Sequence, residues 1–119
     1  TIVVCDNEVM GKPANEEDAI RMLKQLSGKK HEVITGVCLL STEKELRFHT
    51  KTIVEFFDYD DEFVKAYVAS KVPLDKAGAY GIQDKGALLI KGIEGDYYTV
   101  MGLPIGELYQ ALKKFHEVD

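Results

Sequence analysis

EVITGVCLLS, residues 32–41, and LRFHTKTIVEFF, residues 46–57, are the two longest strand-like stretches of the sequence. The first is rich in Val, Ile, Thr and Leu. The second alternates apolar residues and threonines with charged residues, which is the pattern of a half-buried strand. Because only four residues join the two stretches, an antiparallel hairpin is their simplest pairing. The sequence therefore predicts a sheet built around this hairpin.

Three helices are predicted around the hairpin. Residues 15–27 carry apolar side chains at helical spacing, with Asn15 as the N-cap and carboxylates in the first turn. A second helix begins at Asp60 or Asp61. Pro104 suits the first turn of a last helix, because proline is tolerated where no intrahelical amide bond is needed. These helices are expected to cover the sheet.

Further strand-like pieces complete the element order. They are residues 1–5, 8–10, 86–94 and 97–101. A turn signal at Asp6-Asn7 makes the first two a hairpin. The resulting order, β-β-α-β-β-α-loop-β-β-α, predicts an α/β fold with a mixed β-sheet flanked by helices, in a single domain of residues 1–119. It does not predict an alternating, doubly wound architecture.

Length and charge narrow the classes of function. The chain has 119 residues and a formal net charge of −5, so it fits one domain with its own core. Acidic excess argues against broad binding to a nucleic acid polymer, which needs a basic field, but it leaves room for a small nucleotide held by local lysines. The sequence shows no signal peptide and no apolar run long enough to span a bilayer. We expect no membrane partner.

The cysteines and histidines show no ligand spacing. Cys5 and Cys38 lie in apolar strand-like runs, which favours two buried thiols over a disulfide and fits a reducing, cytosolic compartment. His49 and His116 are predicted to lie at the surface. His31 stands at a helix-to-strand junction, where a structural hydrogen bond in a turn is favoured over a catalytic role.

DKAGAYGIQ, residues 75–83, combines charged, amide, aromatic and glycine residues in one short loop. Lys76 can neutralise phosphate as a mobile point charge. Asp75 can orient or coordinate a hard cation such as Mg²⁺. Gln83 can donate and accept hydrogen bonds at once, which suits reading a base edge. Composition alone leaves a functional loop and an ordinary surface loop about equally open.

Other common motifs are absent from the sequence. It contains no Walker loop, no GxGxxG fingerprint, no CxxC and no HExxH. Lys12 lies between Gly11 and Pro13, so its backbone is constrained in a way that would help to aim its amine. Taken alone, this lysine is more simply read as a solvated turn residue.

Several segments, in the same order and along nearly the whole chain, resemble the Maf family. They are Thr1-Ile2-Val3-Val4, Gly11-Lys12-Pro13, Met22-Leu23-Lys24-Gln25-Leu26-Ser27-Gly28, His31-Glu32-Val33-Ile34-Thr35-Gly36-Val37, Tyr67-Val68-Ala69-Ser70, Pro73-Leu74 with residues 75–83, and Gly102-Leu103-Pro104. These proteins were first called septum-formation inhibitors and are nucleoside triphosphate pyrophosphatases. The resemblance implies a Maf and inosine-triphosphatase-like fold.

The resemblance also implies a reaction and roles for particular residues. Water attacks the α-phosphate of a nucleoside triphosphate, with a divalent metal, Mg²⁺ or Mn²⁺, as cofactor. Lys12 matches the family's catalytic lysine, and Asp75 and Lys76 match its D-K-A-G segment. Thr1 and Gln83 match positions tied to substrate choice. Some members act on modified pyrimidine nucleotides, which would make the role a house-cleaning one.

The form of the substrate loop implies a subfamily. With Gly78, Tyr80 and Gly81 before the glutamine, the loop resembles that of the members acting on dTTP and UTP rather than on 7-methyl-GTP. These residues are therefore expected to line the substrate site. A homodimer is a possible assembly.

The chain departs from the family at its beginning. The family has a Ser-rich, Arg-Arg phosphate loop near its N-terminus and an aspartate base directly before the residue matching Thr1, and neither occurs here. We therefore expect a chain lacking the N-terminal portion of the family domain, inactive or nearly so by itself, because a base and several phosphate contacts are missing. A non-catalytic nucleotide-binding module and a partner-binding Maf-like module remain the alternatives.

Overall fold

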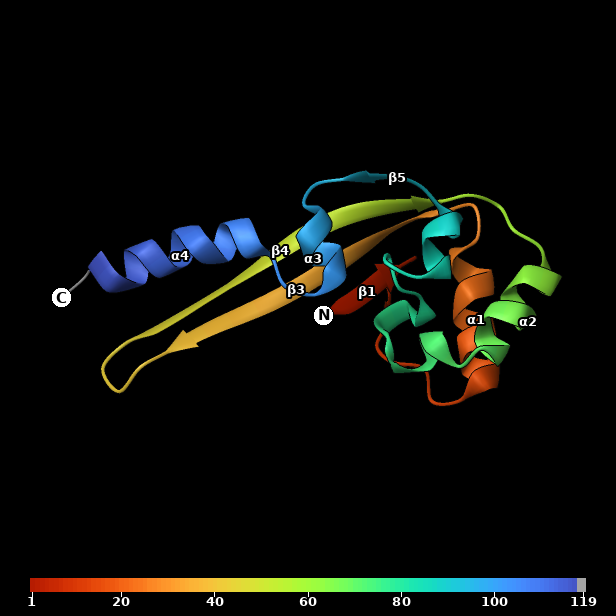
Figure 1. The fold of residues 1–119 in the computed structure, drawn as a ribbon, viewed down its shortest axis with the longest axis horizontal. Helices are drawn as coiled ribbons and strands as arrows, with labels where there is room; N and C mark the ends of the chain where they lie inside the picture. The colour runs from red at the N-terminus through yellow and green to blue at the C-terminus, as the bar shows by residue number, and fades with distance from the viewer. Residues whose placement is uncertain (118–119) are drawn as a thin grey trace.

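A five-stranded antiparallel sheet forms the frame of the protein, in a computed structural model that describes residues 1–117. The strand order is β2-β1-β3-β4-β5, and each neighbouring pair is antiparallel (Figure 1). The strands are β1 Ile2–Cys5, β2 Glu8–Met10, β3 Lys30–Leu40, β4 Glu45–Phe56 and β5 Ile90–Glu94. The long hairpin of β3 and β4 is confirmed, with Val33 opposite Thr52 and Leu40 opposite Glu45.

Four α-helices and three short 3₁₀ segments accompany the sheet in the described chain. The helices are α1 Glu16–Leu26, α2 Asp61–Ala69, α3 Tyr97–Met101 and α4 Ile105–Glu117, and the 3₁₀ segments are η1 Val72–Asp75, η2 Ala77–Ala79 and η3 Lys85–Leu89. The N-caps of the first two helices are confirmed. The Asn15 side chain accepts from the amide of Asp18 at 2.8 Å, and the Asp60 side chain accepts from Phe63 at 2.8 Å.

The α/β class, with a helix-flanked sheet, is confirmed. The sheet was expected to be mixed, and all the strand pairings among residues 1–117 are antiparallel instead. For two of the four pairings, the reason lies in the connections. The first two strands and the central pair are joined by tight hairpins, and such short links can join antiparallel neighbours only.

Two predicted strands are wrong in whole or in part. Residues 86–94 begin as the 3₁₀ segment η3 and become a strand at Ile90. Residues 97–101 form the helix α3. The side chain of Asp96 accepts from the amides of Tyr98 and Thr99 at 3.3 and 3.0 Å. This cap starts a helical turn in a segment whose aromatic and β-branched residues would otherwise favour a strand.

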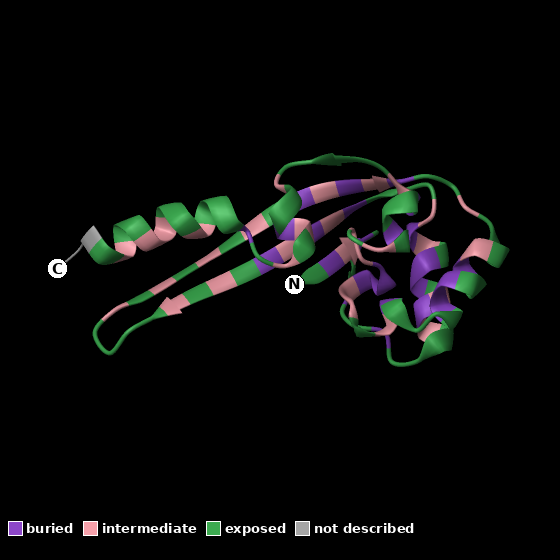
Figure 2. Ribbon diagram, in the orientation of Figure 1, coloured by how far each residue is buried: buried purple, intermediate pink, exposed green. Residues whose placement is uncertain are grey.

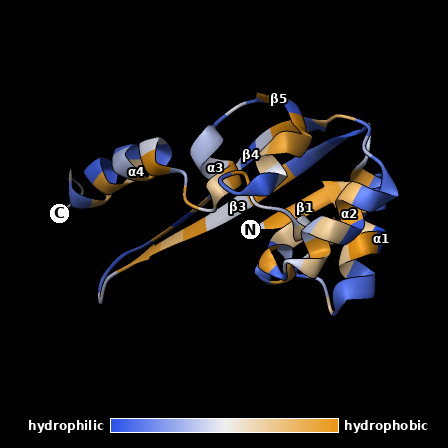
Figure 3. Cartoon of the chain, turned by 45° about the vertical axis from the view of Figure 1, so that its right-hand side comes forward, coloured by the Kyte–Doolittle hydropathy of each residue, from blue (hydrophilic) through white to orange (hydrophobic). Residues whose placement is uncertain are grey.

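The core lies at one end of an elongated molecule that measures 56 × 26 × 26 Å. Figure 2 shows the buried segments gathered where α1 and α2 pack beside β1 and the first part of β3. We call residues 36–49 of the β3–β4 hairpin, together with α4, the arm, and the rest of the described chain the globular end. Hydrophobic residues concentrate on β1 at the globular end, whereas α1 and α4 each carry both hydrophobic and hydrophilic residues (Figure 3).

The arm is held together by contacts at its far end. The Lys44 ammonium donates to the carbonyl of Phe115 at 2.8 Å and lies 5.6 Å from the centre of that ring. Both cysteines are free, as expected, and Cys5 is buried. The prediction that Cys38 is buried is wrong, because this residue pairs with Arg47 on the exposed arm. None of the helices that the structure describes has the length and apolar character of a membrane-spanning segment.

Candidate functional site

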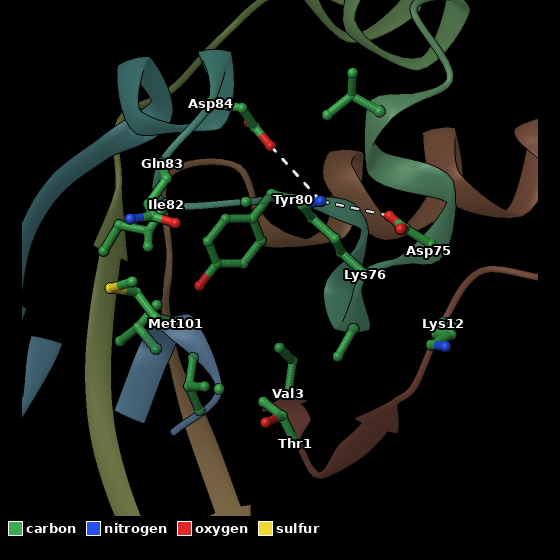
Figure 4. A pocket seen from close by; sticks show the side chains of 16 residues that line it. Thr1, Val3, Lys12, Asp75, Lys76, Tyr80, Ile82, Gln83, Asp84 and Met101 are labelled. Atoms are coloured by element: carbon green, nitrogen blue, oxygen red, sulfur yellow. Dashed lines mark hydrogen bonds and ion pairs between the residues drawn. The ribbon is translucent and has the colours of Figure 1, made fainter. Parts of the chain in front are cut away.

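A pocket of about 650 Å³ opens at the globular end (Figure 4). It lies between β1, the turn that follows β2, the segment from η1 to η3 and the end of α3. Its lining includes seven of the eight expected site residues, namely Thr1, Lys12, Asp75, Lys76, Tyr80, Gly81 and Gln83. Gly78, the eighth, does not line it. The volume is in the range of pockets that bind small molecules.

Gly78 fastens the loop of residues 75–83 to the turn that carries Lys12. Its amide donates to the carbonyl of Gly11 at 3.1 Å. Gly78 has a φ of +71°, and a Cβ on it would lie 2.8 Å from Cγ2 of Val3. A side chain would therefore collide with β1, and the left-handed backbone would be strained. This close approach brings Lys12 and Lys76 to the same pocket.

Lys76 lies between two carboxylates. Its Nζ is 3.4 Å from Oδ1 of Asp75 and 4.0 Å from Oδ2 of Asp84, as the dashed lines in Figure 4 show. The Asp75 side chain is 78% exposed and that of Asp84 is 25% exposed. The ammonium is thus held near the pocket by one exposed and one enclosed partner.

The other side of the pocket is less charged. Figure 4 shows Ile82, Gln83 and Met101 together, on the side away from Lys12 and Asp75. Gln83 is exposed, so its amide is accessible to a ligand. Apolar side chains beside an amide can pack on a flat ring while the amide bonds to the ring's edge.

Thr1 belongs to a chain of hydroxyl groups under the pocket wall. Its Oγ1 is 2.9 Å from Oγ1 of Thr35, which in turn donates to the carbonyl of Thr99 at 2.9 Å. Because the Thr35 hydroxyl has one proton, Thr1 is the donor in the first bond. The chain links β1, β3 and α3, and so it positions Thr1 relative to Met101.

Tyr80 anchors the loop in the core. It is buried, and its hydroxyl lies 2.7 Å from Nε2 of His31. Both rings pack edge-on against Phe56. Burial lowers the pKa of His31 to about 4, so the imidazole is neutral at pH 7. The expected structural role of His31 fits this bond, although the residue lies in β3 rather than in a turn. His49 and His116 are exposed, as predicted.

Sequence reasoning missed several residues of the site. Among them, Asp84 and Met101 line the pocket, and Tyr67 and Gly86 form hydrogen bonds with Asp84. A local signal existed for one of them: an aspartate two residues before a glycine is typical of an Asx turn, and Asp84 does accept from the amide of Gly86 at 2.7 Å. The contact with Tyr67 joins α2 to the loop, and nothing local predicts it.

The described residues do not form a metal site by themselves. None of them belongs to a group of three or more His, Cys, Asp or Glu side chains that could hold an ion. The two pocket carboxylates, Asp75 and Asp84, both lie beside the Lys76 ammonium, whose positive charge opposes a cation. We therefore assign no step to a metal held by these residues alone.

Comparisons with known proteins agree with one another. A family model described as "Maf: Maf-like protein" matches residues 1–115. A dTTP/UTP pyrophosphatase of Bacillus mycoides strain KBAB4 is 53% identical over 115 residues, which are 97% of this chain and 60% of that protein. A dTTP/UTP pyrophosphatase of Bacillus cereus strain B4264 is 51% identical over the same shares. The chain thus spans about 60% of the length of the curated relatives it matches.

Proposed function

This chain belongs to the Maf family, and from that membership we propose that its pocket is part of the active site of a nucleoside triphosphate pyrophosphatase. The substrates we propose are dTTP and UTP, which are hydrolysed to the monophosphate and pyrophosphate. The relatives that carry this activity in their names support the choice. Modified pyrimidine nucleotides are further candidates.

One observation carries the proposal: a single pocket has two lysines toward one side and an accessible amide between apolar side chains toward the other. A nucleoside triphosphate has the same two-part chemistry, an anionic chain at one end and a flat, hydrogen-bonding base at the other. The fixed contact between the substrate loop and the turn before Pro13 maintains the spacing of the two parts.

The residues then have distinct tasks. Lys12 and Lys76 neutralise negative charge on the phosphates, which grows on the leaving pyrophosphate in the transition state. Asp75 orients the Lys76 ammonium from the solvent side. Gln83 bonds to the edge of the base, and Thr1 supports the wall opposite the loop. We assign the general base to none of these residues.

Family membership makes Mg²⁺ or Mn²⁺ the expected cofactor of the reaction. Such ions supply charge neutralisation at transferring phosphoryl groups, and they are commonly bound by one or two carboxylates together with the substrate phosphates. Of the pocket carboxylates, Asp75 is the more exposed. A single domain, a cytosolic location, a house-cleaning role and a homodimer also remain expectations from the sequence.

Base selectivity tests the proposal. We would measure the affinity of the chain for UTP, dTTP, CTP and ATP by titration calorimetry, with Gln83→Glu as the variant. A carboxylate can accept from cytosine N4 but repels O4 of uracil, so the variant should lose about tenfold in preference for UTP over CTP. Equal affinity for all four nucleotides, or a variant with unchanged selectivity, would contradict the proposed role.

Turnover tests the proposed role of Lys12 in binding the phosphates. Pyrophosphate release from UTP and dTTP would be measured for the native protein, as the cell produces it, and for its Lys12→Ala variant. Lys12 is exposed in a turn, so the variant should fold normally and yet lose about a hundredfold in kcat. A variant that keeps full turnover would exclude Lys12 from the phosphate contacts.

A further inference from the structure

Behind the substrate loop, Tyr67 and Asp84 form a hydrogen-bonded pair. Tyr67 lies on α2 and is 3% exposed. Its hydroxyl donates to Oδ1 of Asp84 at 2.6 Å and accepts from the amide of Gly81 at 3.0 Å. Burial and the neighbouring carboxylate raise the pKa of Tyr67, so it remains a protonated donor. One hydroxyl thus connects a core helix, the carboxylate and the loop backbone.

Asp84 has partners on several sides. Oδ1 also accepts from the amide of Gly86 at 2.7 Å, while Oδ2 faces the ammonium of Lys76 at 4.0 Å. Asp84 directly follows Gln83 in the chain. The same side chain therefore touches the phosphate-binding lysine and holds the backbone next to the base-reading amide.

Two glycines beside the pair have no room for a side chain. A Cβ on Gly81 would collide with Oδ2 of Asp84 and would lie 2.6 Å from Cε of Lys76. A Cβ on Gly86 would collide with the carbonyl oxygen of Gly81 and would lie 2.7 Å from the Tyr67 hydroxyl. Such close approach is possible at glycine alone, so the loop is wrapped tightly around the pair.

We propose that the Tyr67–Asp84 pair is a positioning device that fixes the backbone carrying Gln83 relative to the Lys76 ammonium, and so determines the selectivity for uracil and thymine over cytosine. The inference rests on the proposed function of the pocket. It assigns a task to two side chains that lie outside the expected set of site residues.

Selectivity needs such a device because an amide discriminates between bases only from a well-defined position. A glutamine amide can discriminate between O4 of uracil and N4 of cytosine only where it lies at a constant place beside that edge of the base. Discrimination therefore requires that the backbone carrying Gln83 be held in place. The bonds from Tyr67 to Gly81 and from Asp84 to Gly86 fix that segment on both sides of Gln83.

The test compares three variants by their affinities for UTP and CTP, measured by calorimetry on the 119-residue chain. Tyr67→Phe keeps the ring but removes the hydroxyl, and Asp84→Ala removes the acceptor. Each should reduce the preference for UTP over CTP by about tenfold, the equivalent of one hydrogen bond to a charged group. Asp84→Asn keeps an oxygen acceptor for Tyr67 and Gly86, so it should restore selectivity to within about twofold of the unmodified chain.

Tyr59→Phe is the matched control. This half-buried tyrosine also donates a hydrogen bond, in its case to the backbone carbonyl of Leu23, and it does not line the pocket. Its loss should lower the melting temperature while leaving the ratio of UTP to CTP affinity unchanged. Hydrogen exchange at the Gly81 amide gives a readout without nucleotide, and exchange should be faster in Tyr67→Phe than in Tyr59→Phe.

The outcomes separate the two proposals. If the unmodified chain prefers UTP but Tyr67→Phe and Asp84→Ala keep that preference, the positioning role is wrong and the proposed function stands. If Asp84→Asn loses selectivity as fully as Asp84→Ala, the positioning account is also overturned, because charge rather than hydrogen bonding would then matter. If the unmodified chain binds neither UTP nor dTTP, the proposed function fails and the inference fails with it.

Discussion

The globular end and the arm differ in what holds them, although β3 and β4 run through both. At the globular end, Val54 and Phe56 of β4 are 0% and 1% exposed. In the arm, none of the described side chains of residues 36–49 or of α4 is buried. The same strand is thus part of a packed core at one end and a partly solvated ribbon at the other. The alternating pattern of the sequence does not show whether a side chain lies in the packed core or in the partly solvated ribbon.

The pocket lies at the end where packing fixes the backbone. Its loop is held by buried partners such as His31 and Tyr67. Polar contacts near the surface, such as Lys44 with Phe115, hold the tip of the arm. A site that must discriminate between similar bases requires the first kind of support. The predictions below test this difference, from the largest expected effect to the smallest.

Truncating one phenylalanine in each region gives the largest contrast. Phe56→Ala should lower the free energy of unfolding by about 3–5 kcal/mol, because it leaves a cavity in the core. Phe48→Ala, on the same strand but half-buried in the arm, should cost about 1 kcal/mol or less. Urea unfolding of both variants measures the difference. Equal losses would mean that the arm is as well packed as the globular end.

Acid should weaken the globular end through His31. The folded protein holds the pKa of this buried imidazole at about 4, below the unfolded value of about 6.5. The unfolded chain therefore binds the proton first. Stability is fully present above about pH 6.5 and falls by up to about 3 kcal/mol as the pH drops to about 4.

The variant His31→Gln shows how far all other titrating groups change the free energy of unfolding with pH. Its urea unfolding free energy should depend less on pH between those limits than that of the unmodified chain. The difference between the two curves isolates the contribution of His31. Parallel curves would show that the imidazole is not held neutral in the folded protein.

A glycine pair extends the contrast to the backbone. Gly78→Ala should cost about 2 kcal/mol or more, since it combines a left-handed φ with a clash against Val3. At Gly36 in the arm, no atom lies within 4 Å of the position that a Cβ would take, and alanine there should be neutral or slightly stabilising. Thermal unfolding compares the two. If Gly78→Ala is harmless, the loop is not locked against β1 as described.

Two lysines test where charge matters for binding. Lys76→Ala should reduce the affinity for UTP by about tenfold, because it removes a charged partner of the phosphates. Lys113→Ala, on α4 of the arm, should leave that affinity unchanged. Calorimetric titration of both variants at the same ionic strength checks the expectation. Equal effects would point to a diffuse field rather than to a defined phosphate contact.

Much of the fold could be predicted because its signals are local. Asn15 and Asp60 cap helices through their own neighbours, and the alternation after Leu46 indicates a strand whatever packs on it. The helix at residues 97–101 was missed because the cap from Asp96 outweighs the strand propensity of the residues after it. Cys38 was misplaced for a related reason: an apolar strand pattern does not say what covers it.

The site residues also divide into those that sequence motifs predict and those that depend on tertiary contacts. Resemblance to a family identified Lys12, Lys76 and Gln83, and the structure brings all three to one pocket. Their roles remain predictions. Tyr67 and Asp84 could not be paired from sequence, since the helix and the loop that carry them meet only in the folded chain. Residues that touch a ligand can be found by motif, whereas those that hold them in place depend on tertiary contacts.

Backbone amide shifts of the ¹⁵N-labelled 119-residue chain, titrated with UTP, test the central claim most directly. We predict that the shifts concentrate in residues 11–12, 75–84 and 100–102, which surround the pocket, and that the arm stays unchanged. Shifts that fall mainly in the arm, or no shifts at millimolar UTP, would contradict a nucleotide site at the globular end.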